Sequence, residues 1–498
     1  MNNLLVIPLL IPLCTAALLV FVKNNIPAQR WLSAISMIGT TAVAAAIVYQ
    51  VRAEGIQTLH MGGWLPPYGI VFTADLFAAL LVLAASAVAF FCLLYSFGSV
   101  GEQRERYYYY PFFQFLLVGV NGSFLTGDLF NLFVCFEVML ISSYALIVLG
   151  GTKRQLRETL KYILVNILSS TLFVASVAYL YGVTGTLNMA DLSQRVAEAG
   201  QGGILNVIAV LFMIVFSLKA GLFLFFWLPG SYSVPPAAVA ALFGALLTKV
   251  GLYALIRTFM LIFYHNPDST HTWIAWMAAA TMILGALGAI AYTDVQKILN
   301  YNVIITVGFI AFGLAVANEA SMDGVVFYLL HDMAAKALLF FLGGMVVRLT
   351  GTNSLTEMGG LIKRYPLLGW MLFVTSLAIA GIPPLSGFAG KLLILLGGIE
   401  EESFWLTGTA LASSFIVLYS LIRMFMGAFW GEEKPLRSNS TSGSAKASLP
   451  ATLMLPAAGL FIIVLAIGLG SEWVYRLAAE AGHTLMNPAI YIDAVLKE

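Results

Sequence analysis

Residues 128–149 read DLFNLFVCFEVMLISSYALIVL, a run that begins with Asp128, is otherwise mostly apolar and carries a second acidic residue, Glu137, near its middle. A transmembrane helix needs about 20 mostly apolar residues, so this run is long enough to cross a bilayer. Similar runs recur along the whole chain, and a window of about 19 residues places fourteen candidate spans. They lie near residues 3–22, 31–51, 74–97, 108–125, 128–149, 159–183, 203–226, 236–263, 272–292, 295–317, 322–347, 366–399, 403–430 and 450–470.

The composition of the 498 residues points the same way. Hydrophobic residues make up 60% and charged residues only 10%, against about 25% charged in soluble domains, and the mean hydropathy is +0.92. These values exclude a water-soluble enzyme and predict an all-α polytopic membrane protein. The net charge of +1 gives no reason to expect a nucleic-acid partner. The three cysteines lie in apolar runs without CxxC spacing, so we expect neither a metal site nor a cofactor.

The basic residues test the number and direction of the spans. Sixteen Lys and Arg residues fall in or beside the odd-numbered connections, and five fall in or beside the even-numbered connections and the two tails. Because cytoplasmic connections carry the excess of Lys and Arg, this distribution predicts an even number of spans with both termini outside. The remaining four basic residues lie inside spans: Lys219, Lys249, Lys336 and Lys391.

Charged groups inside spans are the strongest indication of function. Besides the four lysines, the predicted spans contain Glu137, His331 and Asp332. An ionisable group at the bilayer centre costs about 2.5–3.5 kcal/mol on insertion scales, so groups of this kind usually move ions or protons. Burial favours neutral lysine, whereas a nearby carboxylate favours the charged form, so a movable carboxylate can switch the proton of a lysine on and off.

Glu137 and His331 each allow two interpretations. Glu137 stays charged only if water or a cation reaches it, and a buried lysine is the natural partner. Such a pair either takes part in ion movement or merely fixes the orientation of two helices. His331 lies five residues before Lys336 and titrates near neutrality, so it is a candidate proton relay, although a lone buried histidine is often only hydrogen-bonded.

The seventh and twelfth spans contain residues that interrupt helices. Pro229 follows Lys219 and Gly221, and Pro383 and Pro384 precede Lys391. Proline removes a helical hydrogen bond, so we expect broken helices with polar backbone at both places, the alternative being a simple kink.

The two lysines next to these breaks also suggest an internal duplication. Lys219 and Lys391 lie in spans seven and twelve, five spans apart. A unit with an odd number of spans enters the membrane upside down in its second copy, which predicts two inverted repeats. The predicted organisation is three N-terminal spans in residues 1–100, a five-helix repeat of spans four to eight in 107–263, a second repeat of spans nine to thirteen in 272–431, and a last span with a short tail in 450–498. We expect the tail to lie along the outer membrane surface.

Several of these motifs resemble a known family, the proton-pumping, antiporter-like membrane subunits shared by respiratory complex I and Mrp-type multisubunit sodium/proton antiporters. The resemblance covers most of the chain, from about the third to the thirteenth span. It rests on the following motifs: Phe136-Glu137, Lys219, Trp227-Leu-Pro229, Thr248-Lys249-Val-Gly251, His331 with Lys336, and Gly381-Ile-Pro383-Pro384-Leu-Ser-Gly387-Phe-Ala-Gly390-Lys391.

The resemblance implies a role for each of these residues. Glu137 and Lys219 match a gating pair, and Lys249, His331 and Lys391 match a hydrated proton relay in the middle of the membrane. Lys336 matches a further family position.

At two positions the chain differs from the complex I members of this family. Complex I members usually carry histidines where this chain has Phe225 and Tyr232. The surrounding segment resembles the D-type members of Mrp antiporters instead, as do Phe243 to Tyr253 and the stretch from Pro488 to Tyr491.

This resemblance implies a proton-translocating, non-enzymatic subunit of a sodium/proton antiporter in the bacterial plasma membrane. Its partners would be subunits of the A, B, C, E, F and G types, membrane lipid, H⁺ and, at the level of the complex, Na⁺. Two alternatives remain open: a proton-pumping subunit of a redox complex such as an NADH-quinone oxidoreductase or a membrane-bound hydrogenase, and a scaffold that only holds its neighbours in place.

Overall fold

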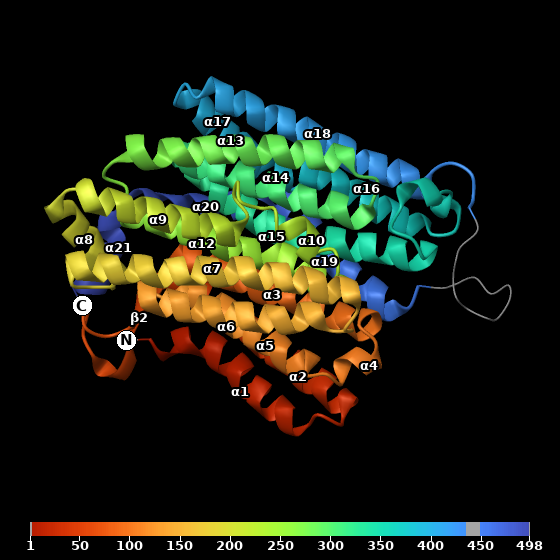
Figure 1. Ribbon diagram of the computed structural model, residues 1–498, viewed down its shortest axis with the longest axis horizontal. Helices are drawn as coiled ribbons and strands as arrows, with labels where there is room; N and C mark the ends of the chain where they lie inside the picture. Colours follow the sequence, from red (N-terminus) through yellow and green to blue (C-terminus); the bar gives the residue numbers. More distant parts are fainter. Residues whose placement is uncertain (1, 435–448, 498) are drawn as a thin grey trace.

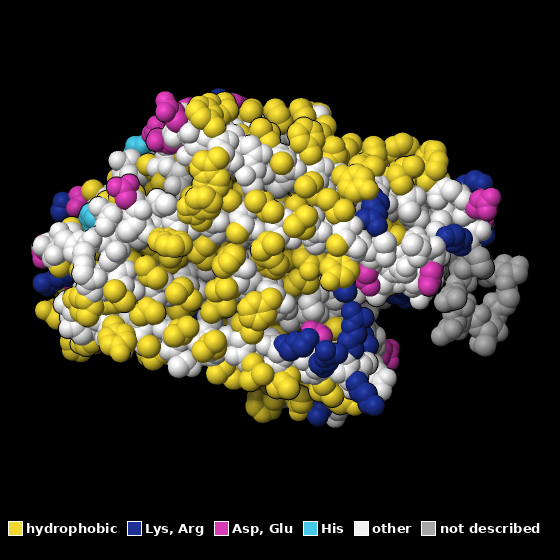
Figure 2. All heavy atoms as spheres, turned by 45° about the horizontal axis from the view of Figure 1, so that its top comes forward, with side chains coloured by type: hydrophobic (Ala, Val, Ile, Leu, Met, Phe, Trp, Pro, Cys, Tyr) yellow, Lys and Arg dark blue, Asp and Glu magenta, His cyan; other side chains and the backbone are white. Residues whose placement is uncertain are grey.

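The fold is a bundle of long helices that run roughly side by side (Figure 1). This computed structural model describes residues 2–434 and 449–497. Twelve helices within these ranges are long and apolar enough to cross a membrane. Hydrophobic side chains cover much of the long side of the bundle shown in Figure 2, as expected for a surface in contact with lipid. The prediction of a helical, multi-pass membrane protein is therefore confirmed.

The N-terminal region contains three long helices and one small sheet. Its elements are η1 (Asn3–Val6), α1 (Ile7–Phe21), α2 (Ile26–Glu54), β1 (Gln57–His60), η2 (Met61–Gly63), β2 (Val71–Ala74), α3 (Leu76–Ser99) and α4 (Glu102–Glu105). Strands β1 and β2 pair antiparallel, with Gln57 opposite Ala74 and His60 opposite Val71. This hairpin is an addition to the all-α prediction and lies between the second and third spans.

The central part of the chain supplies two groups of helices. The first contains α5 (Tyr109–Leu125), α6 (Leu129–Val148), α7 (Lys153–Thr184), α8 (Met189–Ala199), α9 (Gly203–Ala220), α10 (Leu228–Ser231), α11 (Ala237–Leu242), the π-helical turn η3 (Phe243–Leu247) and α12 (Thr248–Leu261). The second contains α13 (Pro267–Ala291), α14 (Val295–Val316), α15 (Glu319–Thr350), η4 (Leu355–Glu357), η5 (Leu361–Lys363), α16 (Pro366–Ala380), α17 (Gly387–Glu400) and α18 (Phe404–Phe429).

The predicted count of fourteen spans is not settled by helix length. The expected fourth span is α5, which has only 17 residues. The expected twelfth span consists of two short helices, α16 and α17, separated by residues 381–386. These two are the expected spans that fall outside the twelve long helices, so fourteen remains a prediction.

Matching local geometry occurs in the two central groups. Asp128 caps α6 and forms a bridge with Asn188, and Asp294 caps α14 and forms the same antiparallel bridge with Ser354. Two helices lie between the bridge residues in each group. The second of them, α7 or α15, has 32 residues, begins with a capping box and ends at a glycine in the left-handed region. A duplicated unit would leave such a pattern, while the inverted orientation of the units stays a prediction.

The C-terminal helices are α19 (Ala451–Leu469), α20 (Ser471–Met486) and α21 (Pro488–Leu496). Helix α20 packs against α15 and α3, and the position of the tail along the outer membrane surface stays a prediction. Its buried residues recur on one face, so α20 presents an apolar stripe to the bundle. They are Val474, Leu477, Ala478, Ala481 and Leu485.

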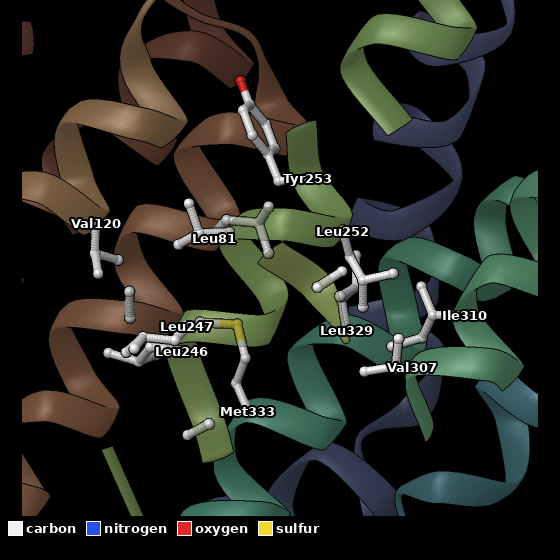
Figure 3. Close-up of a cluster of buried hydrophobic side chains, with 14 of the residues drawn as sticks. Leu81, Val120, Leu246, Leu247, Leu252, Tyr253, Val307, Ile310, Leu329 and Met333 are labelled. Atoms are coloured by element: carbon white, nitrogen blue, oxygen red, sulfur yellow. The ribbon is translucent and has the colours of Figure 1, made fainter. Parts of the chain in front are cut away.

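Helices α12 and α15 form the centre of the hydrophobic core. Helix α15 contacts α14, α17, α19 and α20, and all or nearly all of the apolar windows of α11 to α12 and of α15 are buried. Figure 3 shows Leu252 of α12, Val307 of α14 and Leu329 of α15 gathered in this core, with Met333 of α15 beside Leu247. The interior lysines of α12 and α15 are therefore held by the most enclosed helices of the molecule.

Candidate functional site

A first cluster joins α6, α7 and α9 through a serine. Ser170 of α7 donates a hydrogen bond to the Glu137 carboxylate, and Lys219 Nζ donates to Ser170 Oγ at 3.2 Å. Lys219 is 5% exposed, whereas Glu137 is only half-buried. Within the described chain, Glu137 and Lys219 form no direct ion pair. The two predicted partners are thus brought together, but a hydroxyl group lies between them.

The end of α9 determines the position of Lys219. The helix stops at Ala220 because Gly221 adopts a φ of +76°, a left-handed conformation that glycine accepts without strain. The predicted break therefore falls at Gly221. Pro229, the proline predicted to break the helix, lies instead in the first turn of α10, where its missing N–H would have no partner anyway.

A second cluster lies in the centre of the core and contains two lysines on one carboxylate. Lys249 Nζ is 2.6 Å from Asp332 Oδ2, and Lys336 Nζ is 3.7 Å from Asp332 Oδ1. All three side chains are fully buried. Each ammonium also donates to a backbone carbonyl, Lys249 to Gly244 at 2.8 Å and Lys336 to Asn302 at 2.9 Å. The Gly244 carbonyl belongs to η3, and a π-helical turn displaces carbonyls from the ordinary helical ladder.

The third cluster surrounds the break between α16 and α17. His331 Nδ1 is 2.7 Å from Ser386 Oγ, and its Nε2 has no hydrogen-bond partner among the described residues. Lys391 Nζ donates to the Ala380 carbonyl at 3.0 Å and to Ser414 Oγ at 3.2 Å. Ala380 ends α16, so the ammonium lies at the negative end of that helix dipole.

The residues of this break match the sequence prediction in position. Pro383 and Pro384 lie in the segment 381–386 between the two helices. Gly381 ends α16 with a φ of +88°, as Gly221 ends α9. The two lysines differ in their position relative to these glycines. Lys219 lies two residues before Gly221, whereas Lys391 lies ten residues after Gly381.

The three clusters lie on neighbouring helices but are not joined by hydrogen bonds. The end of α9 packs closely on α12 at Gly251, two residues beyond Lys249, and His331 adjoins Asp332 in the chain. No hydrogen bond between described side chains links one cluster to the next. Proton transfer between clusters therefore requires water or a side-chain rotation.

Several polar residues of these clusters were missing from the predicted relay. Asp332 was recognised as an interior charge but received no role, although its place four residues before Lys336 on one helix was visible in the sequence. Ser170 and Ser386 had no distinguishing signal, since serine is common in apolar helices.

A further buried charge pair lies outside the predicted relay. Arg257 of α12 was assigned to the flank of a span, yet it is buried and pairs with Asp75 at 2.8 Å. Its guanidinium also lies over the rings of Phe77, Tyr253 and Tyr491, at 5.8, 5.3 and 4.9 Å from their centroids. The pair therefore joins α3, α12 and α21.

Comparison with known proteins identifies the family. Residues 126–428 match the family described as NADH:quinone oxidoreductase/Mrp antiporter, TM. Over the full length of both chains, the sequence is 54% identical to the D-type subunit of the Na(+)/H(+) antiporter of Bacillus subtilis and 46% identical to the protein of the same name in Alkalihalophilus pseudofirmus.

Solved structures agree with this assignment. A chain of the Mrp complex from Dietzia sp. DQ12-45-1b superposes with a TM-score of 0.90 at 29% identity, with complete coverage of both chains. A chain of the archaeal membrane-bound sulfane sulfur reductase also gives 0.90, at 27% identity, covering 99% of this chain and all of that one. The chain therefore belongs to the family of membrane subunits shared by NADH:quinone oxidoreductases and Mrp antiporters.

Proposed function

We propose that this chain is the proton-translocating D-type subunit of a multisubunit Na⁺/H⁺ antiporter. The observation that carries the proposal is the series of three lysine clusters across the core, centred on the fully buried Lys249, Asp332 and Lys336. Charges in such a place are costly, and those that occur there usually serve ion or proton movement. The full-length identity to two D-type antiporter subunits supports the same function.

The first cluster is suited to receive a signal from outside the subunit. Glu137 is half-buried, so a charge on a neighbouring subunit or an arriving proton can reach its carboxylate. When Glu137 is neutralised, Ser170 loses its charged acceptor and Lys219 loses the nearest negative charge. Lys219 then releases its proton more easily toward α12.

The second cluster can then act as a switch. The carboxylate of Asp332 is shared unequally, since it lies 1.1 Å nearer to Lys249 than to Lys336. A proton arriving at either lysine shifts the carboxylate toward that lysine and weakens its hold on the other. Repeated transfers of this kind would move a proton toward His331 and Lys391 at the α16–α17 break.

The proposal includes an orientation and partners. Both termini face the outside of a bacterial plasma membrane, and the chain acts with subunits of the A, B, C, E, F and G types. The similarity to a chain of the Dietzia Mrp complex supports this assembly. Sodium would cross at the level of the complex.

A second candidate function is that of a proton-pumping subunit in a redox complex. The similarity to a chain of the sulfane sulfur reductase, described as an archaeal respiratory membrane complex, favours it. The D-type antiporter relatives are more similar in sequence, at 54% and 46% against 27%, so we place the antiporter first.

The test is sodium-dependent dissipation of an imposed pH gradient in everted vesicles from antiporter-deficient bacteria that express the whole complex. We expect exchange by the wild type and its loss in Glu137→Ala and Lys219→Ala at equal assembly. Lys161→Ala is the matched control, since it removes a lysine whose side chain is 51% exposed. Wild-type exchange by Lys219→Ala would refute the relay, and a wild type without exchange would put the redox complex first.

A further inference from the structure

A cavity of about 580 Å³ opens between α4, the beginning of α5 and the end of α6. It lies at the end of the bundle opposite to the two termini (Figure 1). Its lining combines one cation, Arg104, with apolar or aromatic groups of Tyr107, Phe112, Ala145 and Val148. Its volume falls in the range of about 300–1,000 Å³ that is usual for sites of single small ligands.

The cation in this cavity has no partner of its own. Arg104 is half-buried, and no carboxylate or carbonyl among the described residues pairs with its guanidinium. The nearest acidic residue in the chain, Glu105, is fully buried and already paired with Arg30 at 2.9 Å. The cavity lining contains no Asp or Glu. A half-buried guanidinium without an anion favours binding of one from outside the chain.

Further positive charge surrounds the mouth of the cavity. Gly150 and Gly151 line it, and Lys153 and Arg154 follow directly at the start of α7. Both side chains are exposed and form no ion pair with any described residue. Figure 2 shows Lys and Arg side chains gathered toward this end of the molecule. Such a cluster beside a membrane attracts anionic headgroups.

Another part of the cavity lining is apolar and belongs to α5, an expected span, and to α6. Phe112 is in α5, and Ala145 and Val148 are in α6, which is one of the twelve candidate spans. Tyr107, at the rim, is 63% exposed, and exposed aromatic residues of this kind are typical of the membrane interface. The cavity therefore joins an anion-binding group at the headgroup level to an apolar surface at the acyl-chain level.

We propose that this cavity binds an anionic phospholipid, with the phosphate on Arg104 and the acyl chains along Phe112, Ala145 and Val148. A free phosphate ion would leave the apolar wall unused. A phospholipid uses both halves of the site. This inference does not depend on the antiporter function.

The test measures lipid retention on the full-length chain purified from membranes, by native mass spectrometry with added phosphatidylglycerol or phosphatidylcholine. We expect retained phosphatidylglycerol on the wild type and about tenfold weaker retention by Arg104→Ala, the effect of losing one charge-assisted hydrogen bond. Arg106→Ala is the matched control, because Arg106 lines a different surface hollow, and it should stay within about twofold of the wild type.

A second variant tests the apolar wall without changing any charge. Ala145→Trp fills the cavity and should also reduce retention of phosphatidylglycerol, even if Arg104→Ala proves too unstable to purify. Equal retention of the two lipids, or undiminished retention by either variant, would overturn the proposal. Displacement of the lipid by millimolar inorganic phosphate alone would show that the site binds a free anion instead.

Discussion

Replacing Asp332 by Asn removes the only negative charge of the second cluster and leaves two buried lysines. At an effective dielectric constant of about 20, two unit charges 2.6 Å apart attract each other by about 6 kcal/mol before desolvation is counted. Removing one partner of a buried pair costs about 3–5 kcal/mol. Because about 1.4 kcal/mol corresponds to a factor of ten, the state with both lysines charged becomes at least about a hundredfold rarer.

If proton transfer passes through that state, sodium-dependent exchange should fall at least tenfold in Asp332→Asn. The assay is the everted-vesicle measurement, with the amount of assembled complex determined on the same membranes. Asp323→Asn is the control, since it makes the same change nine residues earlier on α15 and away from the lysines. Asp332→Glu keeps the charge and should retain part of the activity. Normal exchange by Asp332→Asn at equal assembly would contradict the switch.

The hydroxyl group of Ser170 and the buried pair of Arg257 and Asp75 can each be tested by one substitution. Ser170→Ala removes the hydroxyl group between the carboxylate and the lysine of the first cluster, so sodium-dependent exchange should drop severalfold without loss of assembly. Ser169→Ala is the control and should have little effect, because the hydroxyl group of Ser169 donates to a backbone carbonyl. Arg257→Gln leaves Asp75 buried without its cation and should cost about 3–5 kcal/mol, lowering the midpoint of thermal unfolding of the purified protein by several degrees. An unchanged midpoint would show that the pair contributes no net stability.

The sequence by itself determined the class of the protein and most of the residues of its site. Stretches of about 20 apolar residues can satisfy their backbone in a bilayer only as helices, so the helical, multi-pass class follows from composition, whereas the number and direction of the spans are predictions from hydropathy and the distribution of Lys and Arg. Each interior charge is visible for the same reason, because an ionisable residue stands out against an apolar run. The six proposed relay residues and the two helix breaks were located in this way.

Only the tertiary structure decided which charges meet. That Asp332 of α15 also holds Lys249 of α12, and that Ser170 separates Glu137 from Lys219, depends on how helices distant in sequence pack against each other. Arg257 lies near the end of its predicted span, and the packing of α3 and α21 encloses it. Hydropathy reports the preference of each residue for the membrane, whereas the partner of a buried charge is fixed by side-chain contacts that no local pattern encodes.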